Sequence, residues 1–93
     1  MPKKGYCYIV TNKPHGVLYT GVTSDLIKRV HEHRHGVVPG FTKRYNLTIL
    51  VWAEEFPTIV EAIIAEKRIK KWKRAYKVRL IESKNPDWIE LNH

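Results

Sequence analysis

The stretch GYCYIVTNKPHGVLYTG, residues 5–21, decides the fold of this chain. Residues 5–11 are rich in aromatic and β-branched side chains, which favour a strand, and residues 17–21 resume the same character. Between them, residues 12–16 combine Asn, Pro and Gly, which is typical of a turn. We therefore expect two antiparallel strands joined by a short loop.

The residues that follow predict a helix, a loop and a third strand. Thr-Ser-Asp at 23–25 offers N-cap side chains for a helix that runs to about His35 and ends before Gly36. Residues 37–46, which include Pro39 and Gly40, are expected to form a loop. The run LTILVWA, residues 47–53, is nearly all apolar, so we expect a strand that is central in the sheet or well covered.

The last third of the chain predicts two helices. Pro57 and Thr58 open a helix, which we expect to break near Lys73, and Pro86 ends the second helix at Asn85. A stripe with helical period is predicted to face the core: Ala62, Ala65, Ile69, Trp72 and Tyr76. The order strand, strand, helix, strand, helix, helix predicts an α+β fold, a small three-stranded antiparallel sheet flanked by helices.

Length and composition indicate one small domain. The 93 residues leave room for a single core over about residues 5–83, with a tail at 84–93, and 43% hydrophobic residues are enough to fold it. No apolar run approaches the roughly 20 residues of a membrane-spanning helix, and the N-terminal residues lack the apolar segment of a secretory signal. With Cys7 as its one cysteine, the chain is expected to be cytoplasmic.

The positive charge is concentrated in one segment. Lys and Arg total 17 against 9 acidic residues, a net charge of +8. Eight bases lie together with no acid between them: Lys67, Arg68, Lys70, Lys71, Lys73, Arg74, Lys77 and Arg79. Such a segment attracts nucleic acid phosphates, although a solvated helix face is the plain alternative. We predict that nucleic acid contacts Lys67, Lys70, Lys71, Lys73, Arg74 and Lys77.

Three polar residues stand at helical positions that should be apolar. Arg29 and His33 are four residues apart and share a helix side with Leu26 and Val30. Glu66 lies at the margin of the apolar stripe of the next helix. These residues indicate either a buried salt bridge between Glu66 and Arg29 or a functional site.

Taken together, these segments resemble the GIY-YIG nuclease superfamily, in particular its small stand-alone bacterial members. Residues 6–8, Tyr-Cys-Tyr, stand where that family has Gly-Ile-Tyr, and residues 19–21, Tyr-Thr-Gly, stand where it has Tyr-Ile-Gly. Residues 25–29 followed by His33 are similar to its first helix, and EAIIAE at 61–66 is similar to its third motif. KNPDW at 84–88 also resembles the ending of the stand-alone members.

The resemblance implies a metal-dependent endonuclease that hydrolyses phosphodiester bonds in DNA, with RNA as an alternative substrate. It implies catalytic roles for Tyr8, Tyr19, Arg29 and His33, a metal-binding role for Glu66, and secondary roles for Gly21 and Asn85. For Asn85, a simple helix stop is the favoured interpretation. Val22 stands where several family nucleases carry a lysine, so a positive charge that could lower a tyrosine pKa is missing.

The chemistry of these residue types fits phosphodiester hydrolysis. A Glu66 carboxylate with water and phosphate suits Mg²⁺ or Mn²⁺, and the Arg29 guanidinium suits the scissile phosphate. A phenol has a pKa near 10, so Tyr8 or Tyr19 can accept a proton only if Arg29 or the metal lowers that pKa, or if the proton is relayed onward. His33, with an ordinary pKa near 6.5, is a candidate relay, and the sequence does not decide between the tyrosines.

Two other function classes compete with a nuclease. A nucleic-acid-binding module with weak or lost catalysis would keep the fold and the basic helix. A membrane-surface binder is disfavoured, because Ile69, Trp72 and Tyr76 are expected in the core, so we expect no membrane partner. A chain this short has no room for a separate recognition domain, which favours recognition of backbone or shape and leaves specificity to a protein partner.

Overall fold

The computed structural model of the chain describes residues 3–37 and 40–91. Three strands, β1 (Gly5–Thr11), β2 (Leu18–Thr23) and β3 (Ile49–Phe56), form an antiparallel sheet in the order β2-β1-β3. The helices are α1 (Leu26–Arg34), α2 (Phe41–Arg44), α3 (Ile59–Lys70) and α4 (Arg74–Lys84). The predicted α+β fold is thereby confirmed, including the break between the last two helices, where Lys73 adopts an extended backbone.

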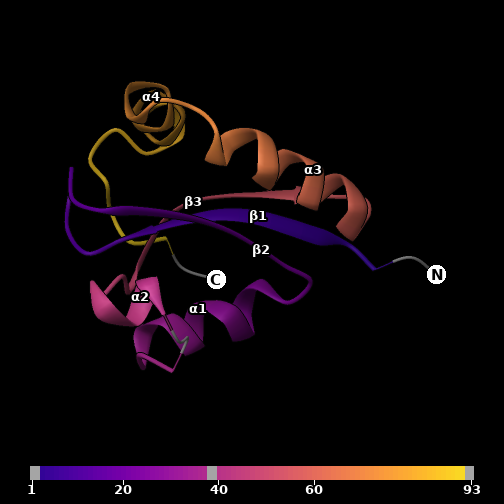
Figure 1. The fold of residues 1–93 in the computed structure, drawn as a ribbon, viewed down its shortest axis with the longest axis horizontal. Helices are drawn as coiled ribbons and strands as arrows, with labels where there is room; N and C mark the ends of the chain where they lie inside the picture. Colours follow the sequence, from indigo (N-terminus) through magenta and orange to yellow (C-terminus); the bar gives the residue numbers. More distant parts are fainter. Residues whose placement is uncertain (1–2, 38–39, 92–93) are drawn as a thin grey trace.

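Helices cover both faces of the sheet. Figure 1 shows α3 and α4 above it and α1 with α2 below it. The buried core under α3 and α4 consists of Cys7, Ile9, Val51, Trp52, Ile69, Ile81 and Trp88. The buried core on the α1 side consists of Tyr8, Val10, Leu26, Val30, Leu47 and Leu50. The alternation of side chains along β1 thus sends Tyr8 towards α1 and Cys7 towards α3.

The third strand is an edge strand that is well covered. It lies beside β1, which is the central strand, yet Leu50, Val51 and Trp52 are all buried. A register shift pairs Ile9 with Trp52 and Val10 with Leu50, so Val51 has no partner on β1. This bulge places Val51 and Trp52 in the same core cluster, because an extra residue interrupts the alternation. The prediction of a covered strand is confirmed, and its central position is not found.

The segment expected to be a loop between α1 and β3 contains the short helix α2. Pro39 of that expected loop lies outside the described residues. Residues 41–46 contain neither Gly nor Pro, so one helical turn can form over Phe41–Arg44. Its end is held by the Leu47 amide, which donates to the Thr42 carbonyl at 2.9 Å.

The predicted apolar stripe is only partly buried. Ala62 and Ile69 are buried, but Trp72 is 36% exposed and Tyr76 is 52% exposed, so their assignment to the core is wrong. The reason is that α3 ends at Lys70, before Trp72, and its helical period does not continue past the extended Lys73 into α4. In α4, Ile81 is the buried residue.

The chain after α4 is tied to the edge of the sheet by Asn85. Its side-chain amide donates to the carbonyls of Val51, at 3.0 Å, and Ile89, at 2.8 Å, and its Oδ1 accepts from the Ile89 amide at 3.0 Å. Asn85 is also the C-cap of α4 and is buried. These contacts give Asn85 a structural role at the helix end. Within residues 3–37 and 40–91, no helix has the length and apolar character needed to cross a bilayer.

Candidate functional site

Tyr8 and His33 form a buried pair on the α1 side of the sheet. Tyr8 Oη lies 3.0 Å from His33 Nε2, and the two rings meet edge to face with centres 5.5 Å apart. Tyr8 is 1% exposed and His33 is 2% exposed. Strand β1 and helix α1 therefore hold a phenol and an imidazole in hydrogen-bond contact, out of water.

Gly21 provides the space that Tyr8 needs. It is the β2 partner of Tyr8, and a Cβ at this position would lie 2.5 Å from both Cζ and Oη of Tyr8. Since real Cβ atoms do not approach so closely, any other residue here would push the phenol out of its place. The secondary role predicted for Gly21 thus has a steric basis in the position of Tyr8.

Tyr19 connects this pair to helix α3. The Tyr19 ring on β2 lies 6.3 Å from the His33 ring, and Lys70 Nζ lies 5.6 Å from the Tyr19 ring centre. Lys70 Nζ is also 3.5 Å from Glu66 Oε1. Because both distances are measured from Lys70 Nζ, Glu66 Oε1 cannot be farther from the Tyr19 ring centre than their sum. This sum is well below roughly 15 Å, the separation beyond which the two side chains could not share a metal-bound water and a phosphate.

Arg29 and Glu66 have different ionic partners. Arg29 Nε lies 3.2 Å from Glu32 Oε1, and Glu66 pairs with Lys70. The buried salt bridge that the sequence allowed between Arg29 and Glu66 does not occur among the described residues. Arg29 instead lies near Tyr8, where its positive charge favours the phenolate and so opposes the rise in the Tyr8 pKa. The structure thus brings together four of the predicted residues, Tyr8, Tyr19, Arg29 and His33. Glu66 lies near this group, because Lys70 contacts both Glu66 and the Tyr19 ring.

Burial controls the protonation of the Tyr8–His33 pair. Desolvation raises the pKa of Tyr8 to about 12, and the opposing charge of Arg29 is too weak to reverse this. Desolvation, followed by repulsion from Arg29, lowers the pKa of His33 to about 4. At neutral pH both groups are uncharged. Tyr8 can therefore act as a base only if its own proton moves to a neighbour, and His33 Nε2 is in contact with it.

Glu66 offers one partly buried carboxylate for a metal ion. Its side chain is 12% exposed. Across the described ranges, no three His, Cys, Asp or Glu side chains cluster as a metal site. An ion at Glu66 would therefore take its other ligands from water and substrate phosphate, which is a usual arrangement for Mg²⁺. The donor set fits such an ion once Lys70 moves off the carboxylate.

Most of the basic segment is exposed, and the exposed Arg74 is also bonded to a distant part of the chain. Its Nη2 donates to the carbonyl of His15 at 2.9 Å and to that of Gly16 at 2.6 Å. Arg74 therefore fixes the β1–β2 loop against the start of α4, a role that the sequence analysis missed. The remaining predicted nucleic-acid-binding residues are exposed, apart from the half-buried Lys77: Lys67, Lys70, Lys71 and Lys73.

Two aromatic side chains lie among these bases. A hollow of about 460 Å³ is lined by Trp72, Tyr76, Arg79, Leu80 and Ser83. The Arg79 guanidinium lies 5.5 Å from the Tyr76 ring centre. A neighbouring hollow is lined by Ile64, Lys67, Arg68, Lys71 and Trp72. The outer side of the α3–α4 bend is therefore both aromatic and strongly basic.

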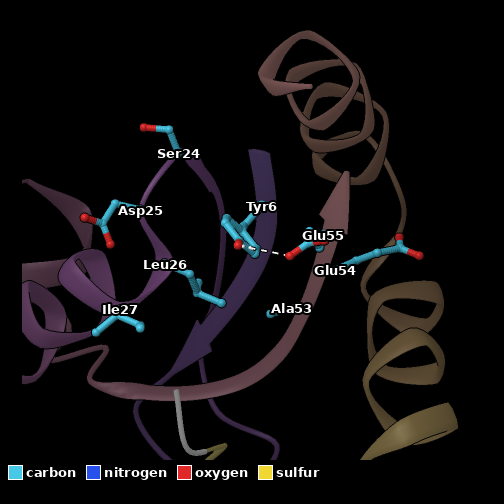
Figure 2. A pocket seen from close by; sticks show the side chains of 8 residues that line it. All are labelled: Tyr6, Ser24, Asp25, Leu26, Ile27, Ala53, Glu54 and Glu55. Atoms are coloured by element: carbon cyan, nitrogen blue, oxygen red, sulfur yellow. Dashed lines mark hydrogen bonds between the residues drawn. The ribbon is translucent and has the colours of Figure 1, made fainter. Parts of the chain in front are cut away.

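A hollow of opposite charge lies at the start of β1. It has a volume of about 450 Å³, and its walls carry Asp25, Glu54 and Glu55. Figure 2 shows the Tyr6 hydroxyl directed at Glu55, to which it donates at 3.0 Å, with Asp25 on the other side of the hollow. The Asp25 and Glu55 carboxylates repel phosphate, so this hollow does not suit nucleic acid.

The three-stranded sheet with helices on both faces is the fold expected of a small nuclease-like domain, and comparison with known proteins agrees on the fold. The GIY-YIG catalytic domain family matches residues 4–79, and the chain belongs to this family. It is a nuclease family whose members generally use divalent metal ions, and it implies DNA as the substrate.

Small bacterial proteins named UPF0213 are similar over most of their length. One from Staphylococcus saprophyticus is 41% identical, covering 84% of this chain and 94% of that protein. One from Staphylococcus haemolyticus is 36% identical, covering 87% and 98%. The solution NMR structure of a UPF0213 protein from Bacillus halodurans matches with a TM-score of 0.57 and 29% identity, over 91% of this chain and 89% of that one. These names state no activity, so the nuclease character rests on the family match.

Proposed function

We propose that this protein is a metal-dependent endonuclease that hydrolyses phosphodiester bonds in DNA. The observation that supports it best is the buried contact between Tyr8 and His33, adjoined by Arg29 and Tyr19 and linked through Lys70 to Glu66. Two uncharged partners that can exchange a proton, beside a cation and a carboxylate, are the groups that hydrolysis of a phosphodiester requires.

Each residue has a distinct part in this proposal. Arg29 binds the scissile phosphate, since it is always charged and offers several N–H donors. Glu66 holds Mg²⁺ or Mn²⁺, which when bound supplies Lewis-acid stabilisation of charge on the phosphoryl oxygens. Tyr8 takes a proton from the attacking water as its own proton passes to His33 Nε2. Tyr19 packs beside them and positions the phosphate or the water.

The exposed bases of the α3–α4 bend supply the nucleic acid surface. Lys67, Lys71 and Lys73 are exposed, so they can contact phosphates regardless of base sequence. Trp72 and Tyr76 are exposed in the same segment and can stack on bases without reading their identity. We propose backbone- or shape-directed binding, with any finer specificity supplied by a partner protein, and a cytoplasmic location.

The proposal is tested by incubating the purified protein with supercoiled and branched DNA and with structured RNA, each with Mg²⁺, with Mn²⁺ and with a chelator. We expect metal-dependent cleavage of DNA that Glu66→Gln abolishes while binding persists. Binding to DNA with no cleavage under any of these conditions would favour the second candidate, a binding module. That candidate is supported by Val22, which leaves β2 without the lysine found in several family nucleases.

A further inference from the structure

The second ring nitrogen of His33 has no partner in the contacts described so far. Nδ1 is fully buried and makes no hydrogen bond to any residue in the described ranges, while Nε2 is 3.0 Å from the Tyr8 hydroxyl. Burying a polar nitrogen without a partner is unfavourable, and such atoms in folded proteins are usually bonded to protein or to ordered water. The surroundings of Nδ1 should therefore contain such a partner.

A small polar cavity lies beside this ring. It is lined by His33, Gly36, Thr42, Lys43, Asn46 and Thr48, and it offers about 10 Å³ of space. That is close to the minimum for one water molecule and too small for an organic ligand. The walls come from the end of α1, from α2 and from the residue before β3. Thr48 has no hydrogen-bond partner among the described residues, so its hydroxyl is available to a water.

The neighbours of Tyr8 decide which His33 nitrogen carries the proton. A neutral imidazole has one N–H donor and one acceptor nitrogen. Tyr8 is 1% exposed, so its hydroxyl is shielded from bulk water. The Tyr8 hydroxyl proton therefore needs an acceptor, and His33 Nε2 is at hydrogen-bond distance. With Nε2 as the acceptor, the proton of His33 lies on Nδ1, the buried nitrogen of a ring that lines the cavity.

We propose that the cavity holds one ordered water molecule that accepts a hydrogen bond from His33 Nδ1–H, and that Thr48 is the positioning residue that holds this water. Thr48 acts through His33, because the partner of one ring nitrogen fixes the tautomer and so the role of the other. The water thereby keeps Nε2 unprotonated, so that this nitrogen can accept the Tyr8 proton.

The consequence for the reaction rests on the proposed nuclease function. As Tyr8 accepts a proton from the attacking water, its own proton passes to Nε2 and the Nδ1 proton passes to the cavity water. From there it reaches solvent past the exposed side chains of Lys43 and Asn46. The attacking water loses one proton and solvent gains one, while Tyr8 and His33 remain neutral. In the reset, a proton returns from the cavity water to Nδ1, the Nε2 proton passes back to the Tyr8 oxygen, and the Tyr8 hydroxyl gives its proton to the leaving alkoxide of the substrate.

The test is the tautomer of His33, measured by long-range ¹H–¹⁵N correlation on protein with ¹⁵N-labelled histidine, at pH 7 and without nucleic acid. We expect the Nδ1–H tautomer in the wild type and in Thr48→Ser, which keeps the hydroxyl. Thr48→Val has nearly the same shape but no hydroxyl, and it should raise the fraction of the Nε2–H tautomer. A wild type in the Nε2–H tautomer, or identical spectra for Val and Ser variants, would overturn the proposal.

Two further measurements separate this proposal from the nuclease proposal. A high-resolution crystal structure should contain a water within hydrogen-bond distance of Nδ1, and an empty cavity would overturn the inference. In cleavage assays Thr48→Val should lower kcat about tenfold with KM unchanged, and Thr48→Ser should restore it. If the wild type cuts no nucleic acid, the nuclease proposal fails. The NMR spectra and the crystal structure would still test the His33 tautomer and the bound water, because neither measurement depends on cleavage.

Discussion

The candidate site joins two regions of opposite character across the β2 edge. On the α1 side, Tyr8 and His33 are buried, uncharged and in direct contact. On the α3 side, Glu66 and Lys70 are charged, more exposed and 3.5 Å apart. A buried neutral pair responds to pH and to the loss of single atoms, whereas a charged pair that is partly exposed responds to metal ions and salt. Substitutions in the two regions should therefore change different measured properties of the protein.

The largest effect is expected on the charged side, from Glu66→Gln. The substitution keeps the size of the side chain but removes the charge that would hold Mg²⁺ or Mn²⁺. Losing several kcal/mol of transition-state stabilisation predicts a fall in cleavage rate of about a thousandfold or more, with DNA binding retained. Single-turnover cleavage and a binding titration measure the two properties separately.

Glu61→Gln is the matched control for that change. Glu61 is on the same helix and exposed, and it takes part in the N-cap contacts of Thr58, which glutamine can also satisfy. The control should cut at close to the wild-type rate. Equal rates for Glu66→Gln and wild type would remove Glu66 from the metal site even though the chain belongs to a nuclease family.

On the neutral side, Tyr8→Phe should have the next largest effect. The ring stays in the core, but the hydroxyl that contacts His33 Nε2 is lost, so we expect cleavage to slow by about a hundredfold. Stability should fall by only about 1 kcal/mol. Tyr19→Phe should slow cleavage less, because Tyr19 is half-buried and its ring is 6.3 Å from that of His33. A larger effect of Tyr19→Phe on the rate would assign the proton-accepting role to Tyr19 instead.

The His33 pKa predicts a dependence of stability on pH. The folded-state pKa of about 4 lies below the unfolded value of 6.5, so the unfolded chain binds the proton more readily. The stabilisation is complete above the unfolded value and is lost as the pH falls towards 4. Between pH 7 and pH 5 this amounts to about 2 kcal/mol. Urea unfolding at the two pH values measures this change in the free energy of unfolding. His33→Gln should lower the pH dependence of stability by that amount. If the variant keeps the pH dependence of the wild type, His33 does not titrate as its burial implies.

Much of this architecture follows from local sequence. The turn at residues 12–16, the caps Asp25 and Thr58 and the apolar strand segments each act over a few residues, and the fold built on them is confirmed. The exposure of Trp72 and Tyr76 was missed because α3 ends at Lys70, before Trp72, and its helical period does not continue past the extended residue Lys73. Its effect on the direction of α4 depends on packing, which a periodic pattern does not contain.

Contacts between distant parts of the chain were not predictable in detail. Arg74 binds carbonyls 58 and 59 residues away, and carbonyl acceptors leave no signature in the sequence. The ionic partners of Arg29 and Glu66 were also open, since helix spacing places a residue on a face but does not choose its neighbour. The family resemblance identified the residues of the candidate site, whereas their protonation and contacts needed the three-dimensional arrangement.

The smallest expected effect is on the salt dependence of DNA binding, and it concerns the charged surface alone. Lys70 and Arg74 are poor choices for this test because both already have partners within the molecule. Lys67, Lys71 and Lys73 are exposed, and replacing all three with Ala should flatten the slope of log affinity against log salt by up to about 3 units.

The comparison that makes this informative is a second triple variant with the same loss of charge, Lys3, Lys13 and Lys28 to Ala. These lysines are exposed but lie outside the basic segment. Because counterion release depends on phosphates actually contacted and not on net charge, the second variant should leave the slope close to that of the wild type. Equal slopes for the two variants would mean that the α3–α4 bend is a solvated face, and that DNA reaches the tyrosines along another surface.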